Sequence, residues 1–73
     1  MARSVGFIGS GTLANVLIKG MIKAGSAKAE DIVASDVDAD RLSRLVEETG
    51  IRAARSNKAV ADAAGVLFLT VKP

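Results

Sequence analysis

The segment from Gly9 to Ala14, with the sequence GSGTLA, constrains the fold of this chain more than any other feature. It follows the apolar run from Val5 to Ile8 and precedes a helical pattern of apolar residues. A strand, a glycine turn and a helix start, in that order, are what a dinucleotide pyrophosphate needs. Gly9 allows a tight turn, Gly11 has no Cβ to obstruct a phosphate, and Ala14 allows the helix to pack closely on the strand.

A glycine-rich hexapeptide has a second interpretation, because a strand-to-helix connection can need glycine only for its positive φ. The placement of this one between a predicted strand and a predicted helix favours cofactor binding. The free N–H groups and the partial positive charge of the helix N-terminus would then face the phosphates.

The composition limits the chain to one small domain and excludes several kinds of chemistry. Of its 73 residues, 49% are hydrophobic but only 3% aromatic, so the core must consist mainly of Ala, Val, Leu and Ile. The sequence has no cysteine and no histidine, which excludes disulfides, thiolate or zinc sites of the usual kinds and histidine acid-base catalysis. We assign no metal ligand and no catalytic residue, since Asp31, Glu47 and Asp62 are interpreted as surface charges.

Charge and hydropathy favour neither nucleic acid nor a membrane as a partner. Ten basic and eight acidic residues give a net charge of +2, and the basic residues are spread along the chain and interleaved with Asp and Glu, whereas a nucleic-acid surface is usually a clustered basic stripe. No apolar segment approaches the ~20 residues that cross a bilayer, and the first residues do not resemble a secretory signal. We therefore expect a soluble, cytoplasmic protein.

Strand patterns and helix patterns alternate along the whole chain, which predicts a parallel α/β sheet with right-handed crossovers. The order expected for a doubly wound dinucleotide fold is 3-2-1-4, so the fold class is a partial, Rossmann-like sheet of about four strands with about three helices. The expected elements are strands over Ser4–Ile8, Ile32–Ala34, Ile51–Ala54 and Val66–Leu69, and helices over Thr12–Ala24, Asp38–Thr49 and Asn57–Ala64.

The first helix is expected to turn one apolar face to the sheet, formed by Leu13, Leu17, Met21 and Ala24. Gly20, inside the same helix, costs about 1 kcal/mol relative to alanine and so indicates close packing against a strand.

The cofactor cleft is expected between the first and fourth strands, where the strand order reverses. The glycine segment would form one wall, and Thr70 to Pro73, at the carboxyl end of the fourth strand, the other.

Asp36 bears on the choice of cofactor. It follows the second strand, where dinucleotide folds often carry an acid that accepts hydrogen bonds from the adenosine ribose and repels a 2′-phosphate. This favours NADH, although Asp36 is also suited to be a turn or capping residue. Arg41 is expected to lie on the following helix rather than to turn toward a phosphate.

Several segments together resemble the N-terminal part of the pyrroline-5-carboxylate reductases. They are GFIGSG from Gly6 to Gly11 with Leu13-Ala14, Ala34-Ser35, Ser56-Asn57-Lys58, and LFLTVKP from Leu67 to Pro73. The resemblance covers the whole chain, and the closing Val-Lys-Pro and the Asn-Lys are its more specific parts. It implies hydride transfer from NAD(P)H to pyrroline-5-carboxylate, which gives proline, in proline biosynthesis.

The resemblance also implies roles for individual residues and a frequent preference for NADPH, against which Asp36 argues. It places Ser35 and Asn57 at the adenosine ribose or its 2′-phosphate. It places the pyrophosphate at Ile8, Gly9, Ser10, Gly11, Thr12 and Leu13. It places the nicotinamide half of the cofactor beside Thr70, Val71 and Lys72.

These reductases continue well beyond the position of Pro73, into the rest of the dinucleotide fold and a helical dimerisation domain. We therefore expect residues 1–73 to be a single N-terminal part of a dinucleotide-binding domain that is inactive alone. The apolar strand from Val66 to Leu69 would have an uncovered edge, which predicts self-association through that edge or the barer sheet face. The alternatives are a stand-alone nucleotide-binding module and a self-associating structural fragment without catalysis.

Overall fold

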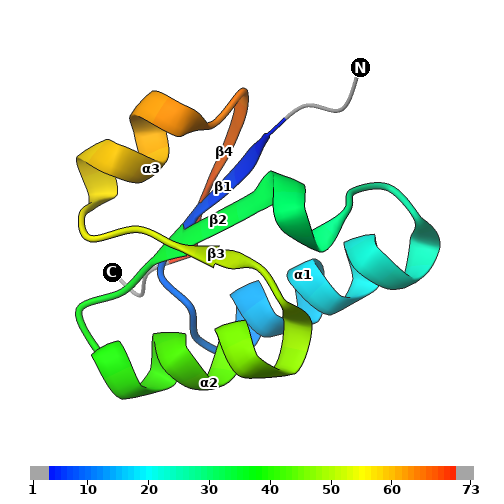
Figure 1. Ribbon diagram of the computed structural model, residues 1–73, viewed down its shortest axis with the longest axis horizontal. Coiled ribbons are helices and arrows are strands. Elements are labelled where there is room, and N and C mark those ends of the chain that lie inside the picture. Colours follow the sequence, from blue (N-terminus) through cyan, green and yellow to red (C-terminus); the bar gives the residue numbers. More distant parts are fainter. Residues whose placement is uncertain (1–3, 71–73) are drawn as a thin grey trace.

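The computed structural model describes residues 4–70. Its sheet contains four parallel strands in the order β3-β2-β1-β4, which confirms the predicted fold class and strand order (Figure 1). The strands are β1 (Val5–Ile8), β2 (Ile32–Ser35), β3 (Arg52–Ala53) and β4 (Val66–Leu69).

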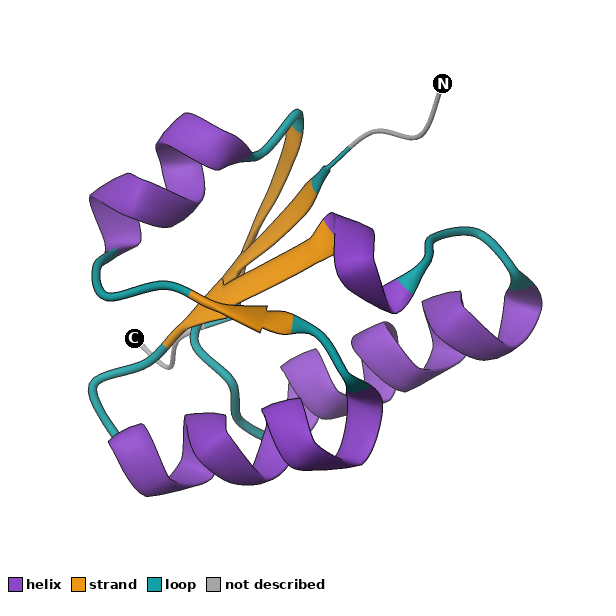
Figure 2. Cartoon of the chain, in the orientation of Figure 1, coloured by secondary structure: helices purple, strands orange, loops and turns teal. Residues whose placement is uncertain are grey.

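Helices cover the sheet unequally, with α1 and α2 on one face and α3 on the other (Figure 2). The bounds are α1 (Thr12–Ala24), α2 (Ala39–Thr49) and α3 (Asn57–Ala63), and the 3-10 turn η1 (Ala29–Asp31) precedes β2. Within the described residues, one face of the sheet is therefore well covered, and the other carries only a helix of 7 residues.

Local sequence signals set the ends of the helices. Gly25 and Gly50 end α1 and α2 with φ of 77° and 79°, a left-handed conformation that glycine adopts without strain. Asp38 caps α2 by accepting a hydrogen bond from the N–H of Arg41 at 3.1 Å. At the start of α3 the cap is Ser56, whose hydroxyl accepts from the N–H of Ala59.

The main core lies between the sheet and the pair α1 and α2. Phe7 of β1 stacks on Phe68 of β4 with ring centroids 5.1 Å apart, which joins the edge strand to this core. The buried members of the core are Phe7, Ala14, Ile18, Ile32, Ala34, Leu42, Leu45 and Ile51.

The predicted inner face of α1 is wrong for two of its four residues. Leu13 is 58% exposed and Ala24 is also exposed, whereas Ala14 and Ile18 are fully buried. Leu17 and Met21 are only partly buried at the edge of the core. The cause is the close approach at Ala14, which turns that side of the helix toward the sheet and leaves Leu13 beside the glycine turn.

Close packing of a helix on a strand occurs at Gly6 rather than at Gly20. A Cβ on Gly20 would meet nothing within 4 Å, so the expectation for that residue is wrong. A Cβ on Gly6 would lie 2.6 Å from Cγ1 of Val60 and 2.7 Å from Cβ of Ala64. Glycine at position 6 therefore lets α3 rest directly on the backbone of β1.

The edge strand β4 is more exposed than its apolar sequence would suggest. Within residues 4–70 it pairs with β1 alone. Leu69 is 70% exposed, and Val66 and Leu67 are 37% and 41% exposed. An apolar strand with one unpaired edge is a template for association with another strand.

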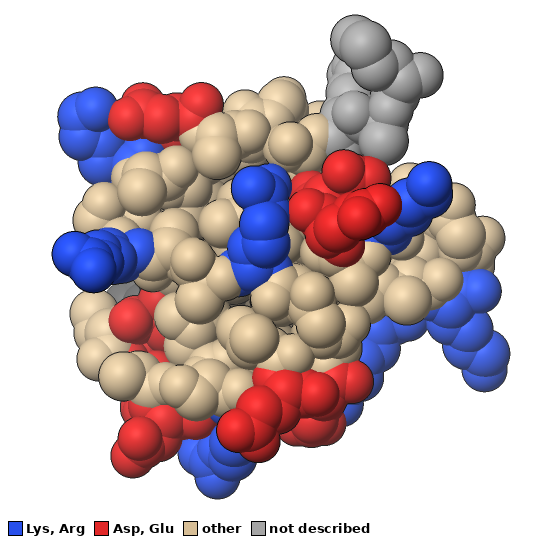
Figure 3. All heavy atoms as spheres, viewed as in Figure 1, with Lys and Arg blue, Asp and Glu red and all other residues tan. Residues whose placement is uncertain are grey.

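Charged side chains of both signs are interspersed over the face drawn in Figure 3. Among residues 4–70, no helix combines the length and the apolar character that crossing a membrane requires.

Candidate functional site

The glycine turn leaves β1 in a conformation that depends on Gly9. Its φ is 102°, a backbone region that other residues rarely adopt. The N–H of Gly9 donates to the carbonyl of Ser35 at 2.8 Å, so the end of β2 supports the start of the turn. The chain then enters α1, with Gly11 as the N-cap residue.

The first backbone N–H groups of α1 have no internal partner. The first hydrogen bond within the helix is donated by the N–H of Asn15 to the carbonyl of Gly11, at 3.0 Å. Gly11 provides no side-chain cap, and the first turn contains no acidic residue. The N–H groups of Thr12, Leu13 and Ala14 therefore remain available for an anion, and the helix dipole adds partial positive charge.

Asn15 orients the carbonyl groups of the turn. Its Nδ2 atom donates to the carbonyls of both Ser10 and Gly11, each at 3.2 Å. Together with the bond from the Asn15 N–H to the Gly11 carbonyl, these bonds tie the glycine turn to the first turn of α1.

Asp36, at the end of β2, holds the turn from the other side. Its Oδ2 atom accepts from the N–H and the hydroxyl of Ser10, at 2.8 and 2.6 Å. Arg41 donates through Nε to Oδ2 and through Nη2 to Oδ1, both at 2.9 Å, and the N–H of Asp38 also donates to Oδ1. The Asp36 side chain is only 2% exposed, so all of these hydrogen bonds are donated to a buried carboxylate.

Burial alone would raise the pKa of the Asp36 carboxyl. The hydrogen bonds from the Asp38 N–H, from Ser10 and from Arg41 outweigh that effect and hold the pKa well below its ordinary value. The group is therefore ionised at any physiological pH, and its charge is matched by donors from the turn and from α2.

Ser35 and Asn57 form a second polar pair at the same end of the sheet. The buried hydroxyl of Ser35 donates to Oδ1 of Asn57 at 2.7 Å. This bond uses the amide oxygen and leaves the Nδ2 group of Asn57, the first residue of α3, as a donor at the cleft.

Thr70 closes the turn from the side of β4. Its N–H and its hydroxyl donate to the carbonyl of Ile8, at 2.9 and 3.0 Å. The same hydroxyl lies 2.7 Å from the carbonyl of Gly9. The turn is thus held by hydrogen bonds from both neighbouring strands.

A cleft of about 830 Å³ opens between these elements, at the carboxyl ends of the strands. Ser10 and Ser35 lie behind its wall, where they hold Asp36 and Asn57 in place. Val71 and Lys72 lie outside the described residues. The predicted residues that line the cleft are Ile8, Gly9, Gly11, Thr12, Leu13, Asp36, Asn57 and Thr70.

Four further lining residues were not among the predicted site residues, namely Val16, Val37, Arg41 and Leu69. Arg41 does lie on α2, as expected, but its side chain turns back to Asp36. The signal in the sequence was its place in the first turn of a helix, because helical side chains point toward the N-terminus. The apolar residues carried no signal, since any of them could have been part of the core.

The arrangement can bind an anion and a nucleotide, but the described residues contain no obvious reaction centre. Among residues 4–70, no group of three or more acidic side chains is arranged to hold a metal ion. The glycine turn, the free N–H groups of α1 and a cleft within the size range of small-molecule sites fit a dinucleotide. The observed geometry thus fits the cofactor that the sequence indicated.

Comparisons with known proteins agree with that fit. The family model described as NADP oxidoreductase, coenzyme F420-dependent, matches residues 4–73. A pyrroline-5-carboxylate reductase of Methanosarcina acetivorans is 39% identical over 71 residues, which are 97% of this chain and 26% of that protein. Pyrroline-5-carboxylate reductase 2 of Bos taurus is 44% identical over 72 residues, covering 96% of this chain and 22% of that one.

A solved structure gives the same result for the fold. The pyrroline-5-carboxylate reductase of Coxiella burnetii matches with a TM-score of 0.89 and 29% identity, over 100% of this chain and 27% of that chain. The resemblance to this group of reductases is therefore confirmed. The chain spans between 22% and 27% of the length of these three relatives.

Proposed function

This chain belongs to the family of coenzyme F420-dependent NADP oxidoreductases, and we propose that it binds a nicotinamide dinucleotide as the N-terminal segment of a pyrroline-5-carboxylate reductase. The observation that carries the proposal is the uncapped start of α1, which opens into the cleft beside Gly9 and Gly11. Residues 1–73 would be a single, N-terminal part of the dinucleotide-binding domain.

In this proposal the segment from Ile8 to Leu13 holds the pyrophosphate through the N–H groups at the start of α1. Asn57 contributes its amide donor at the adenosine ribose, with Ser35 behind it. Thr70, Val71 and Lys72 run beside the nicotinamide half. Because β1 and β4 are neighbours, both walls of the cleft belong to this short chain.

The bound dinucleotide supplies a hydride, and in the complete reductase the acceptor would be pyrroline-5-carboxylate, which becomes proline. The residues of this chain bind and orient the cofactor; we assign none of them as an acid, a base or a nucleophile. We expect no turnover from the 73-residue chain alone, and its place in proline biosynthesis and in the cytoplasm stays a prediction.

Calorimetric titration of the chain with NADH and, separately, with NADPH tests the binding proposal. Gly11 has φ of −76°, which any residue can adopt, so Gly11→Val places a side chain at the helix start without straining the backbone. We expect this variant to keep its circular dichroism spectrum and to lose dinucleotide binding. Gly20→Ala is the matched control, because a Cβ there meets nothing within 4 Å.

Binding of either dinucleotide by the parent chain would exclude a purely structural fragment. If neither binds, or if Gly11→Val binds as well as the parent, the proposal is wrong.

We also propose that a second copy of the chain covers the free edge of β4. The support is the exposure of Val66, Leu67 and Leu69 on a strand that pairs, within residues 4–70, with β1 alone. Light scattering coupled to size-exclusion chromatography should show species larger than a monomer. A dilute, stable monomer would contradict this.

A further inference from the structure

We propose that Arg41, held in place by Asp36, recognises the 2′-phosphate of the dinucleotide and makes this site favour NADPH over NADH. The inference rests on the proposed function, since it concerns the adenosine end of the same cleft. It assigns contact with the ligand to Arg41 and a positioning role to Asp36.

The first step is that Asp36 has no spare acceptor for a ribose. A carboxylate has roughly four lone-pair sites. Its two oxygens already accept five hydrogen bonds, two from Ser10, two from Arg41 and one from the N–H of Asp38. With a side chain only 2% exposed, Asp36 cannot accept from a pair of hydroxyls unless one of these bonds breaks.

The second step is that, of the two residues in the ion pair, Arg41 is the one exposed at the cleft. The Arg41 side chain is 45% exposed, whereas its partner is buried. Nε and Nη2 bind Asp36, and Nη1 lies on the side of the glycine turn, 3.8 Å from the position of a Cβ on Gly11. The guanidinium therefore meets the cleft with a donor that residues 4–70 leave unoccupied.

The negative charge of Asp36 does not fully neutralise the positive charge of Arg41. Three of the five bonds to that carboxylate come from uncharged donors, namely the N–H and hydroxyl of Ser10 and the N–H of Asp38. These uncharged donors compensate part of the negative charge of Asp36. Positive potential therefore remains at the outer edge of the Arg41 guanidinium. By contrast, Lys19, which lines an adjoining hollow of about 380 Å³, is paired with Glu48 at 2.9 Å.

The third step concerns the kind of ligand group that such a surface selects. Arg41 and Asn57 both line the cleft, and the nitrogens that their bonds to Asp36 and Ser35 leave over, Nη1 and Nδ2, can donate but cannot accept. A ribose hydroxyl needs an acceptor for its own proton, whereas a phosphate offers only acceptors and negative charge. Planar guanidinium groups bind phosphate especially well. The described residues thus match a 2′-phosphate better than a free 2′-hydroxyl.

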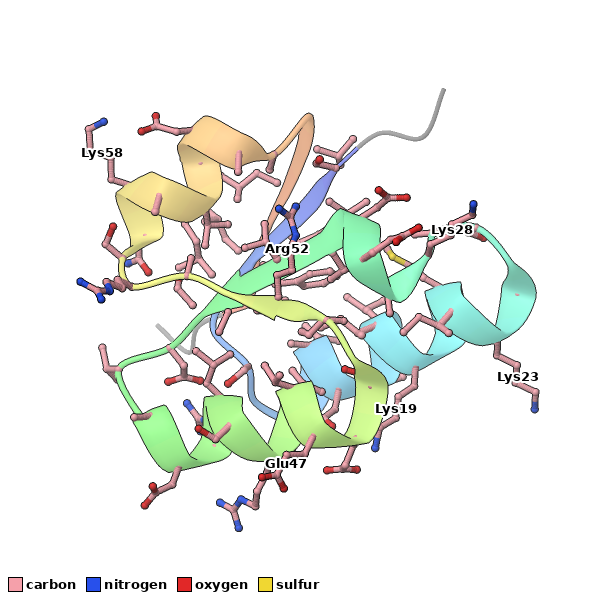
Figure 4. All side chains as sticks on the ribbon, viewed as in Figure 1. Lys19, Lys23, Lys28, Glu47, Arg52 and Lys58 are labelled. Atoms are coloured by element: carbon pink, nitrogen blue, oxygen red, sulfur yellow. The ribbon has the colours of Figure 1, made fainter. Side chains whose placement is uncertain are left out.

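The experiment compares the affinities of the 73-residue chain for NADPH and NADH in parent and variant forms. We expect the parent to prefer NADPH, and Arg41→Gln to weaken NADPH binding by about 10-fold to 100-fold, the range for hydrogen bonds to charged groups. NADH binding should change by less than about twofold. Lys23→Gln removes the same charge from a side chain that projects away from the body of the molecule (Figure 4) and should alter neither affinity.

The role of Asp36 is tested by Asp36→Asn. A merely structural effect would weaken both dinucleotides together, whereas loss of positioning should lower the ratio of NADPH to NADH affinity. Arg41→Lys keeps the charge but not the fork that grips Asp36, so we expect an intermediate ratio. If circular dichroism shows that Arg41→Gln does not fold, Arg41→Lys replaces it as the test of the role of Arg41.

The outcomes separate the inference from the proposed function. Failure of the parent to bind either dinucleotide overturns both. Equal affinity for the two, a preference for NADH, or an equal loss of both in the Arg41 variants overturns the inference and leaves the dinucleotide site intact.

Discussion

The carboxylate of Asp36 accepts hydrogen bonds from both the N–H and the hydroxyl of Ser10, at 2.8 and 2.6 Å, across 26 residues of sequence. These bonds tie the end of β2 to the turn that follows β1. Because the same carboxylate also holds the Arg41 guanidinium, one buried charge fixes both the glycine turn and the side chain beside it.

Removal of the Ser10 hydroxyl should destabilise the chain. Ser10→Ala deletes a buried bond to a charged group, and such bonds contribute about 1.5–3 kcal/mol, while the N–H bond to Asp36 remains. We expect a lower free energy of unfolding in urea. Ser43→Ala on the exposed side of α2 is the control and should change little. Equal stabilities of the two variants would show that the hydroxyl bond is unimportant.

Stability should fall in acid because of Asp36. Its folded-state pKa lies below the ordinary value of about 3.9, so the stabilisation is complete above that value and is lost as the pH falls toward the folded-state pKa. Urea unfolding between pH 7 and pH 2 measures this. Asp36→Asn should be less stable at pH 7, and the difference from the parent should shrink as the pH is lowered below about 4. A constant difference would exclude the linkage.

Two glycine-to-alanine changes should have opposite effects. Gly6→Ala forces a Cβ against Val60 and Ala64, and overpacking of this kind costs about 1–3 kcal/mol. Gly20→Ala fills open space in the middle of α1 and should stabilise by about 0.5–1 kcal/mol through helix propensity. Thermal unfolding of both variants checks the prediction, and two changes of the same sign would refute it.

A charge at the free edge should reduce self-association. Leu69 is 70% exposed on β4, so Leu69→Lys removes apolar surface and places a charge beside unpaired backbone groups. Light scattering should show a smaller mean mass. Val37→Lys makes the same change in character at a fully exposed residue outside the sheet, and should leave the mass unchanged.

Much of the fold was predictable because local patterns determine it. Strand and helix periods, the glycines at 9, 25 and 50, and the rule for parallel crossovers were enough for the strand order. The buried face of α1 was not, since Leu13 and Ala14 are adjacent and the approach of the turn decides which of them faces the sheet.

The site divides in the same way. The glycine turn was evident from its sequence, whereas the environment of Asp36 was not. A carboxylate after the second strand fits either an open ribose acceptor or a closed ion pair, and only the direction of the Arg41 side chain distinguishes them. Gly20 and Gly6 show a related limit, because the sequence marks a glycine but not what lies opposite it.

The hydrogen bonds from Thr70 to Ile8 and Gly9 span 62 and 61 residues, respectively. The turn between β1 and α1 is among the earliest parts of the chain to be synthesised, yet its last supports arrive only when β4 docks. The chain should therefore gain its affinity for a nucleotide late in folding, once β4 has paired with β1.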